Sequence, residues 1–404
     1  MSISRPSARE TRIPSAGFRG GQLGDARAAA VIVGAVRSPV GKRNGGLAGV
    51  HPADLSAHVL RTLVERTGVD PALIEDVVWG CVGQVGEQAF DIGRTSALAA
   101  GFPESVTGVT VDRQCGSSQQ AVSFAAAGVI AGQYDLVVAG GVESMSRIPL
   151  NLQNSIGGSP MDATGWIERY GPGIPTQAVG AQLIADRWGF SRTRMDEFSL
   201  TSHEKAAHAQ DTGLFDGQLA PIAGVTKDEG IRRGGTLETL AALKPAFRED
   251  GTITAGNASQ ISDGSAAVLV TSSERAAELG LRPLVRVHTA VTAGADPIEM
   301  LSAPIPATRR VLAKSGLQLA DIGAFEVNEA FACVPLAWLA DVGADEKLLN
   351  PNGGAIALGH PLGGSGARLM TTLIHHMRDN GIRHGLQTMC EGGGQANATI
   401  LELL

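Results

Sequence analysis

The chain has 404 residues, enough for two or three packed units and a large buried core. Its formal charge of -7 disfavours a nucleic-acid binder, because binding phosphates requires a basic surface. The four cysteines lack the density of a disulfide framework, and no apolar run approaches the length of a membrane span, so we expect a reduced, cytoplasmic protein.

Short apolar runs alternate with helical patterns along most of the chain. Continuous apolar runs are typical of strands buried on both faces, and apolar residues recurring every three or four positions indicate helices. The runs predict strands over residues 29–35, 77–82, 109–111, 136–139, 266–271, 284–287, 324–327 and 399–403. The helical patterns cover residues 52–66, 93–100, 119–130, 177–188 and 193–209. This alternation predicts an α/β fold with a partly parallel sheet.

Two parts of the chain depart from the alternation. Residues 1–28 carry five arginines and little apolar periodicity, so we expect a flexible extension, with organelle targeting as the less favoured alternative. From about residue 148 to 256, glycine, proline and polar helices indicate an inserted region. Residues 136–143 and 387–394 are faintly alike, and each follows a glycine-containing turn that opens a helix. This likeness indicates two similar halves but is too short to prove a duplication.

Cys115 lies between a predicted strand end and a predicted helix start. The N-terminus of a helix favours a thiolate and lowers the pKa of a cysteine, so Cys115 is a candidate nucleophile. From position alone, a small buried hydrophobe is the more common role. Cys81 and Cys333 stand among apolar neighbours, and for both we expect that core role.

His360 and Cys390 lie in two glycine-rich segments, where the backbone can approach a ligand closely. Together with Cys115 they form a candidate thiolate catalytic set. Three zinc ligands are the alternative, but the residues are far apart in sequence and lack metal-ligand spacing, so we expect no metal. His203 and His208 resemble a metalloprotease helix but are five residues apart rather than four, and we expect a solvent-exposed helix face there.

The combined motifs resemble the thiolase family, the acyl-CoA C-acyltransferases. The segments around Cys115, Asn328, His360 and Cys390 are similar to four signature segments of that family, in the same order. Lesser similarities extend the resemblance from about residue 29 to the C-terminus. The resemblance implies two similar α/β halves in a five-layered body with an inserted loop domain. The implied units are residues 29–147 with 255–283, the CoA-binding insertion 148–254, and residues 284–404.

The resemblance also implies roles for the site residues. Cys115 would take the acyl group, activated by His360, and Cys390 would act as the second acid or base. His360, with a water held by Asn328, would stabilise one thioester oxygen. The backbone N–H groups of Cys115 and Gly392 would stabilise the other, as a developing oxyanion requires.

Coenzyme A is implied as a substrate, with no tightly bound cofactor. The positions that similarity assigns to CoA binding are Arg232, Thr239, Phe247, Ala255 and Ser259. By itself, Arg232 beside Arg233 is more often an ordinary exposed basic pair. Met300 and Phe331 are similar to residues of the acyl pocket, although a lone methionine is more often core filler.

The implied function is thiolysis of a 3-ketoacyl-CoA to acetyl-CoA and a shortened acyl-CoA, or the reverse Claisen condensation. A decarboxylating ketosynthase and a non-catalytic acyl-CoA-binding relative remain as alternatives. Residues 175–180 lack the His-Met pair of short-chain biosynthetic thiolases, which favours degradative or broad-range relatives in fatty acid beta-oxidation. The family implies a homodimer or homotetramer, with a multienzyme beta-oxidation complex as a further alternative.

Overall fold

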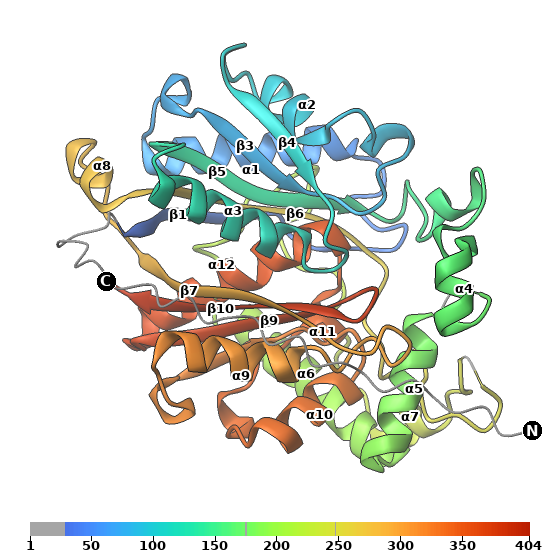
Figure 1. Cartoon of the computed structure of the whole chain (residues 1–404). Coiled ribbons are helices and arrows are strands. Elements are labelled where there is room, and N and C mark those ends of the chain that lie inside the picture. The colour runs from blue at the N-terminus through green and yellow to red at the C-terminus, as the bar shows by residue number, and fades with distance from the viewer. Residues whose placement is uncertain (1–28, 174–175, 247) are drawn as a thin grey trace, which may run out of the picture.

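One ten-stranded sheet organises the molecule (Figure 1). The computed structural model describes residues 29–173, 176–246 and 248–404, so the predicted extension 1–28 lies outside the described residues. The strands are β1 Ala30–Arg37, β2 Gly41–Lys42, β3 Asp76–Gly80, β4 Thr107–Val111, β5 Leu136–Ser144, β6 Ser262–Ser272, β7 Val285–Gly294, β8 Ala324–Val327, β9 His384–Glu391 and β10 Gln395–Leu403. Their order is β4-β3-β5-β6-β1-β7-β10-β9-β8, with β2 paired to β6.

The sheet consists of two halves with the same pairing pattern. In the first half, β3 is parallel to β5, β5 is antiparallel to β6, and β6 is antiparallel to β1. In the second half, β8 is parallel to β9, β9 is antiparallel to β10, and β10 is antiparallel to β7. The counterpart of β4 is reduced to a parallel bridge between Phe325 and Leu349. The two segments whose likeness indicated a repeat, β5 and β9, therefore occupy equivalent positions.

Helices complete five layers around these two half-sheets. The helices are α1 Pro52–Thr67, α2 Ile92–Ala99, α3 Ser117–Ala131, α4 Thr164–Tyr170, α5 Gln177–Trp188, α6 Arg192–Asp211, α7 Leu237–Ala241, α8 Ser273–Glu278, α9 Pro304–Ser315, α10 Cys333–Val342, α11 Ala355–Leu358 and α12 Leu362–Asn380. Helices α1 and α2 cover one outer face, α9 and α10 the other, and α3 packs against α12 between the halves (Figure 1). None of the described helices is long and apolar enough to cross a membrane.

The alternation of side chains along β1 explains why its sequence is apolar from Ala30 to Val36. Val31 and Val33 belong to the core beneath α1, whereas Ala30 and Ile32 belong to the core around α3 and α12. Because successive side chains of a strand point to opposite faces, a strand covered on both faces needs apolar residues at every position. The predicted strand at 29–35 is confirmed for this reason.

The sheet extends further than its apolar runs. Strand β5 continues past Ala139 to Ser144, and β6 begins at Ser262 rather than at residue 266. Gly140 lies so close to β6 that a Cβ there would collide with the carbonyl oxygen of Ala266. Glycine and polar residues form these strand ends, and their pairing depends on close approach of the two backbones. A search for apolar runs cannot detect such strand ends.

The inserted region packs on the body through both halves. Helix α5 lies against α10, and α6 lies against α11. A fully buried ion pair, with Arg37 Nη1 2.7 Å from Asp228 Oδ1, connects β1 to the insertion. Asp228 Oδ1 also accepts a hydrogen bond from Val40 N at 2.8 Å, so its carboxylate holds the segment that follows β1 against the insertion.

Candidate active site

Cys115 lies in the turn between β4 and α3, where the sequence predicted it. Gln114 adopts a left-handed conformation (φ 50°), and Gly116 caps the helix, so the turn brings the thiol inside the molecule. Only 1% of Cys115 is exposed, and the residue packs in a cluster with Val82 and Met145.

The surroundings of Cys115 make it a protonated thiol at rest. Burial raises the pKa of Cys115, and the neighbouring Cys390 thiol and Glu391 carboxylate raise the pKa further. Gln177 Nε2 donates a hydrogen bond to Sγ at 3.6 Å, which opposes the rise without reversing it. The position at a helix N-terminus predicted a lowered pKa for this thiol, whereas desolvation by burial raises it. A base is needed to remove the proton.

His360 has the properties of such a base. Its Nδ1 lies 2.6 Å from Ser365 Oγ, and that hydroxyl donates to the carbonyl of Pro361 at 2.8 Å. Ser365 Oγ must therefore accept the hydrogen on Nδ1, which leaves Nε2 unprotonated. Burial, together with the charge of Arg368, lowers the pKa of His360 to about 3. The imidazole is consequently neutral and able to accept a proton.

Asn328 connects His360 to Cys390. It follows β8 directly, and its Nδ2 lies 3.4 Å from His360 Nε2 and 3.8 Å from Cys390 Sγ. Burial raises the pKa of Cys390 to about 12, against the opposing effects of Asn328 and the Ala330 N–H. Among the described residues, Asn328 Oδ1 has no hydrogen-bond partner although it is buried. The two thiols, the imidazole and the amide thus share one desolvated region.

Gly392 lies next to the turn that carries Cys115. A Cβ on Gly392 would stand 2.8 Å from Gln114 Oε1 and 3.0 Å from Gln114 Cγ, so a side chain there would crowd this turn. The structure therefore brings the glycine segment after Cys390 against the segment before Cys115. Within the described part of the chain, no group of three or more acidic, histidine or cysteine side chains is arranged to hold a metal ion.

The positions predicted for CoA differ in exposure. Arg232, Thr239 and Ala255 are exposed, whereas Ser259 is half-buried and donates its backbone N–H to Ala330 O at 2.9 Å. Phe247 lies outside the described residues. Ser259 thereby joins the segment between the insertion and β6 to the segment that carries Asn328.

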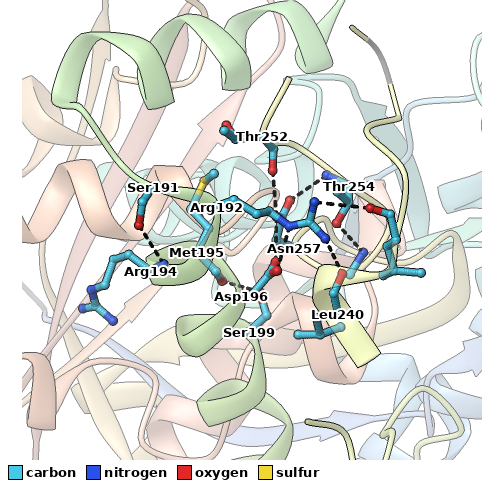
Figure 2. A network of polar contacts seen from close by, with 12 residues as sticks. Ser191, Arg192, Arg194, Met195, Asp196, Ser199, Leu240, Thr252, Thr254 and Asn257 are labelled. Atoms are coloured by element: carbon cyan, nitrogen blue, oxygen red, sulfur yellow. Dashed lines mark hydrogen bonds and ion pairs between the residues drawn. The ribbon is translucent and has the colours of Figure 1, made fainter. Parts of the chain in front are cut away.

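Asp196 fastens the segment that leads to Ser259, as Figure 2 shows. Asn257 Nδ2 donates to Asp196 Oδ1 and to Thr252 O, each at 3.0 Å. Arg192 Nε donates to Asp196 Oδ2 at 2.6 Å, and Arg192 Nη2 donates to the carbonyl of Leu240. The first turns of α6 therefore position both the α7 segment and residues 252–257.

Met300 and Phe331 are buried in the same hydrophobic cluster as Cys390. Met300 adopts a left-handed conformation (φ 60°), which is unusual for a residue other than glycine. The Phe331 segment forms a bridge with Ala258. The two predicted pocket residues therefore belong to the core that also contains Cys390.

The prediction that His203 and His208 lie on a solvent-exposed face of α6 was wrong for His203. His208 is exposed, but His203 is buried, and its Nδ1 accepts the backbone N–H of Arg232 at 3.1 Å. Burial lowers the pKa of His203 to about 4. The histidine is buried because the segment carrying Arg232 folds back over α6, a contact between distant segments that helical periodicity does not reveal.

Three further site residues were not found from the sequence. They are Ser365, which orients His360; Gln177, which contacts Cys115; and Glu329, which accepts hydrogen bonds from Ser202, Asn350 and the Ile356 N–H. Ser365 could have been found by its position, because it places a hydroxyl in the first turn of a helix that begins just after His360. Gln177 and Glu329 act across segments distant in sequence.

Known proteins resemble this chain over nearly its full length. Residues 30–274 match the family model "Thiolase, N-terminal domain" and residues 281–403 match "Thiolase, C-terminal domain". A steroid 3-ketoacyl-CoA thiolase of Mycobacterium tuberculosis is 50% identical over 93% of this chain and 94% of its own length. A 3-ketoacyl-CoA thiolase of Aliivibrio fischeri is 44% identical over 92% and 98%. The crystal structure of the Bacillus anthracis acetyl-CoA acetyltransferase superposes with a TM-score of 0.86 at 39% identity, covering 93% of this chain and 99% of that one.

Proposed function

Because this chain belongs to the thiolase family, we propose that it catalyses CoA-dependent thiolysis of a 3-ketoacyl-CoA and the reverse condensation, through an acyl group on Cys115. The observation that supports this most directly is the position of Asn328. Its amide lies between the unprotonated Nε2 of His360 and the Sγ of Cys390, within the region that also holds Cys115. The site thus pairs a neutral base with two protonated thiols.

In thiolysis, the Cys115 sulfur attacks the 3-keto carbon while its proton passes to His360 Nε2. The bond between C2 and C3 then breaks, and the electron pair left on C2 takes a proton from Cys390, which releases acetyl-CoA. The thiol of a second CoA gives its proton to the Cys390 thiolate and attacks the acyl-cysteine. Cys115 leaves as a thiolate and recovers its proton from His360. Condensation is the reverse of these steps.

Each carbonyl oxygen that becomes negative needs donors already in place. We assign to one oxygen a water held by Asn328, whose buried Oδ1 has no partner among the described residues and can accept from such a water, together with His360, which donates from Nε2 once it holds the Cys115 proton. We assign the N–H groups of Cys115 and Gly392 to the other, supported by the approach of the Gly392 segment to the Cys115 turn. Losing one such donor typically costs about 3 to 4 kcal/mol of transition-state stabilisation.

We assign CoA to the insertion, residues 148–254, and place the family halves at residues 29–147 with 255–283 and at residues 284–404. The exposed Arg232 and Thr239 suit an anionic and polar ligand. Met300 and Phe331, with Cys390 in one cluster, suit an apolar acyl group. CoA is the co-substrate in this scheme, and the chemistry requires no other bound group.

An activity assay with several substrates tests the proposed reaction and identifies the acyl group that the enzyme accepts. Relatives named for 3-ketoacyl-CoA and for steroid 3-ketoacyl-CoA define the panel of substrates to compare. Protein is mixed with CoA and with acetoacetyl-CoA, longer straight-chain 3-ketoacyl-CoAs or a steroid-side-chain 3-ketoacyl-CoA, and acetyl-CoA formation is followed. Turnover with at least one member is expected. No turnover with any member contradicts the proposed activity.

The covalent intermediate is tested separately by intact-mass measurement after mixing with acyl-CoA. Wild type and Cys81→Ala, which removes a buried thiol outside the site, are expected to carry one acyl adduct. Cys115→Ser is expected to carry none on a cysteine. An adduct on another cysteine contradicts the role of Cys115, and binding without an adduct favours a non-catalytic acyl-CoA-binding protein. The remaining alternative is a decarboxylating ketosynthase. A ketosynthase site has a second histidine where this chain has Cys390, which disfavours that activity.

We further propose that the chain forms a homodimer through the β4 end of the sheet. Strand β4 is terminal and pairs with β3, and Val109 on it is 43% exposed. Phe124 and Ile130 on the adjoining α3 are also exposed. Light scattering on the wild type and on Val109→Asp tests this, with dimers expected for the first and a shift to monomers for the second.

A further inference from the structure

Glu391 is a buried acid whose role is not explained by the reaction scheme. It is the last residue of β9, between Cys390 and Gly392, and it is 0% exposed. Among the described residues neither carboxyl oxygen has a partner at hydrogen-bond geometry, although the nearby Asn397 backbone N–H acts to lower the pKa of the acid. A buried carboxyl without partners is costly for a protein to keep, so its position calls for a functional reason.

The carboxyl lies against the turn that carries Cys115. Glu391 Oε1 is so close to Gly116 that a Cβ on this glycine would collide with it. Asn397 Nδ2 would stand 2.8 Å from the same Cβ and donates to Gly116 O at 3.0 Å. Glu391 thus contacts Gly116, the residue that follows Cys115. In the sequence it directly follows Cys390, the other thiol.

Few charged or titratable groups face Glu391. Arg113 and Asp112 do so from the segment before α3, together with Cys115, and Cys390 does so from β9 itself. Arg113 Nη1 donates to Gln395 Oε1 at 2.9 Å, not to Glu391, and its buried Nε has no partner in the described structure. The carboxyl is therefore not neutralised by a direct ion pair, and its charge acts on the two thiols.

We propose that Glu391 is a positioning residue whose own protonation state controls how readily Cys115 and Cys390 lose their protons. When protonated, the carboxyl fills the space beside Gly116 without opposing a thiolate. When ionised, it places a negative charge in the desolvated region where the sulfur of Cys115 must become negative. The proposal rests on the proposed function only in taking these two thiols as the reactive ones.

The electrostatics agree with this geometry. Burial raises the pKa of Glu391 to about 8, although Arg113 acts to lower it. The ionised carboxylate in turn raises the pKa of Cys115 and of Cys390. Glu391 is therefore mostly neutral at pH 7 and becomes charged as the pH rises through about 8, which is the range in which thiols would otherwise become more reactive.

The test measures thiol reactivity directly and needs no turnover. Cys115 is alkylated with iodoacetamide between pH 6.5 and 9.5, and the rate constant for its peptide is followed by mass spectrometry in wild type and in Glu391→Gln. The ratio of the variant rate to the wild-type rate is expected to be close to one below pH 7. Above pH 9 it is expected to rise on the order of 3- to 10-fold, because only the wild type then carries a negative carboxylate close to the thiol.

Two controls separate this from a structural role. Glu249→Gln changes an exposed acid and is expected to follow the wild-type curve at every pH. Glu391→Asp keeps an ionisable group and is expected to keep a pH-dependent ratio to Glu391→Gln. A ratio that is constant across the pH range overturns the proposal, whatever its size. Failure of thiolysis would leave these rates measurable, so the proposed function and this inference can fail independently.

Discussion

His360 and Ser365 form a hydrogen bond that decides which nitrogen of the imidazole is free. The distance from Nδ1 to Oγ is 2.6 Å, and the hydroxyl is already committed as a donor to Pro361 O. Ser365 therefore accepts, the ring hydrogen stays on Nδ1, and the lone pair of Nε2 faces Asn328. The chemistry of the site depends on a serine that does not itself reach the thiols.

Replacing Ser365 by alanine removes the group that selects this tautomer. We expect kcat for thiolysis to fall on the order of 10- to 100-fold, since general-base catalysis is worth about that much or more. KM should change little, because Ser365 does not contact substrate. Ser365→Thr retains a hydroxyl and is expected to recover most of the activity. Equal losses in the alanine and threonine variants would point to packing rather than to the hydrogen bond.

The pH dependence of kcat/KM follows from the neutral histidine. Burial lowers the pKa of His360 to about 3, so the form that accepts a proton persists well below the usual range of histidine. We expect no acidic inflection near 6.5 between pH 5 and 7.5. An inflection there that disappears when His360 is replaced would show that the imidazole is protonated in this range.

His203 is expected to make the fold sensitive to acid. Its pKa is lowered to about 4 in the folded state against 6.5 for an exposed histidine, so the unfolded chain takes up a proton first as the pH falls. The stability lost between pH 7.5 and 5 through this group is about 2 kcal/mol.

The variant His203→Asn keeps an acceptor for the Arg232 N–H and removes the titration. Urea unfolding at both pH values should show a smaller acid loss for this variant than for wild type. His208→Asn, on the exposed side of the same helix, is the matched control and should behave as wild type. Identical acid losses in all three proteins would contradict the assignment.

The ion pair between Arg37 and Asp228 is expected to be a main connection between the insertion and the body. Asp228→Asn leaves a buried guanidinium without its counter-charge and should destabilise the fold by about 3 to 5 kcal/mol. Asp211→Asn removes a pair with Arg233 in which both side chains are about half exposed, and should leave the unfolding midpoint close to that of wild type because solvent screens such a pair. Similar unfolding midpoints for the two variants would argue against the buried pair.

The sequence predicted well those features that depend on local pattern. The apolar runs located the buried strands, the glycine-rich segments indicated Cys115, His360 and Cys390 as one candidate set, and the resemblance to the thiolase family added Asn328. Features that depend on contacts between distant segments were missed. The burial of His203 requires the Arg232 segment to cover it, and the raised pKa of Cys115 requires the second half to close over the turn. Local position at a helix start suggested the opposite shift for that thiol, because it contains no information on desolvation.

The equivalent positions of α3 and α12 have a consequence for how this site arose. Each helix precedes an equivalent strand, β5 in one half and β9 in the other, and the two helices pack against each other in the central layer. The proposed nucleophile stands just before α3 and the proposed base just before α12. A single ancestral half, repeated, would have presented the same helix start twice at one interface. Divergence of one copy toward sulfur and the other toward imidazole then suffices to create a proton-transfer pair that neither half contains alone.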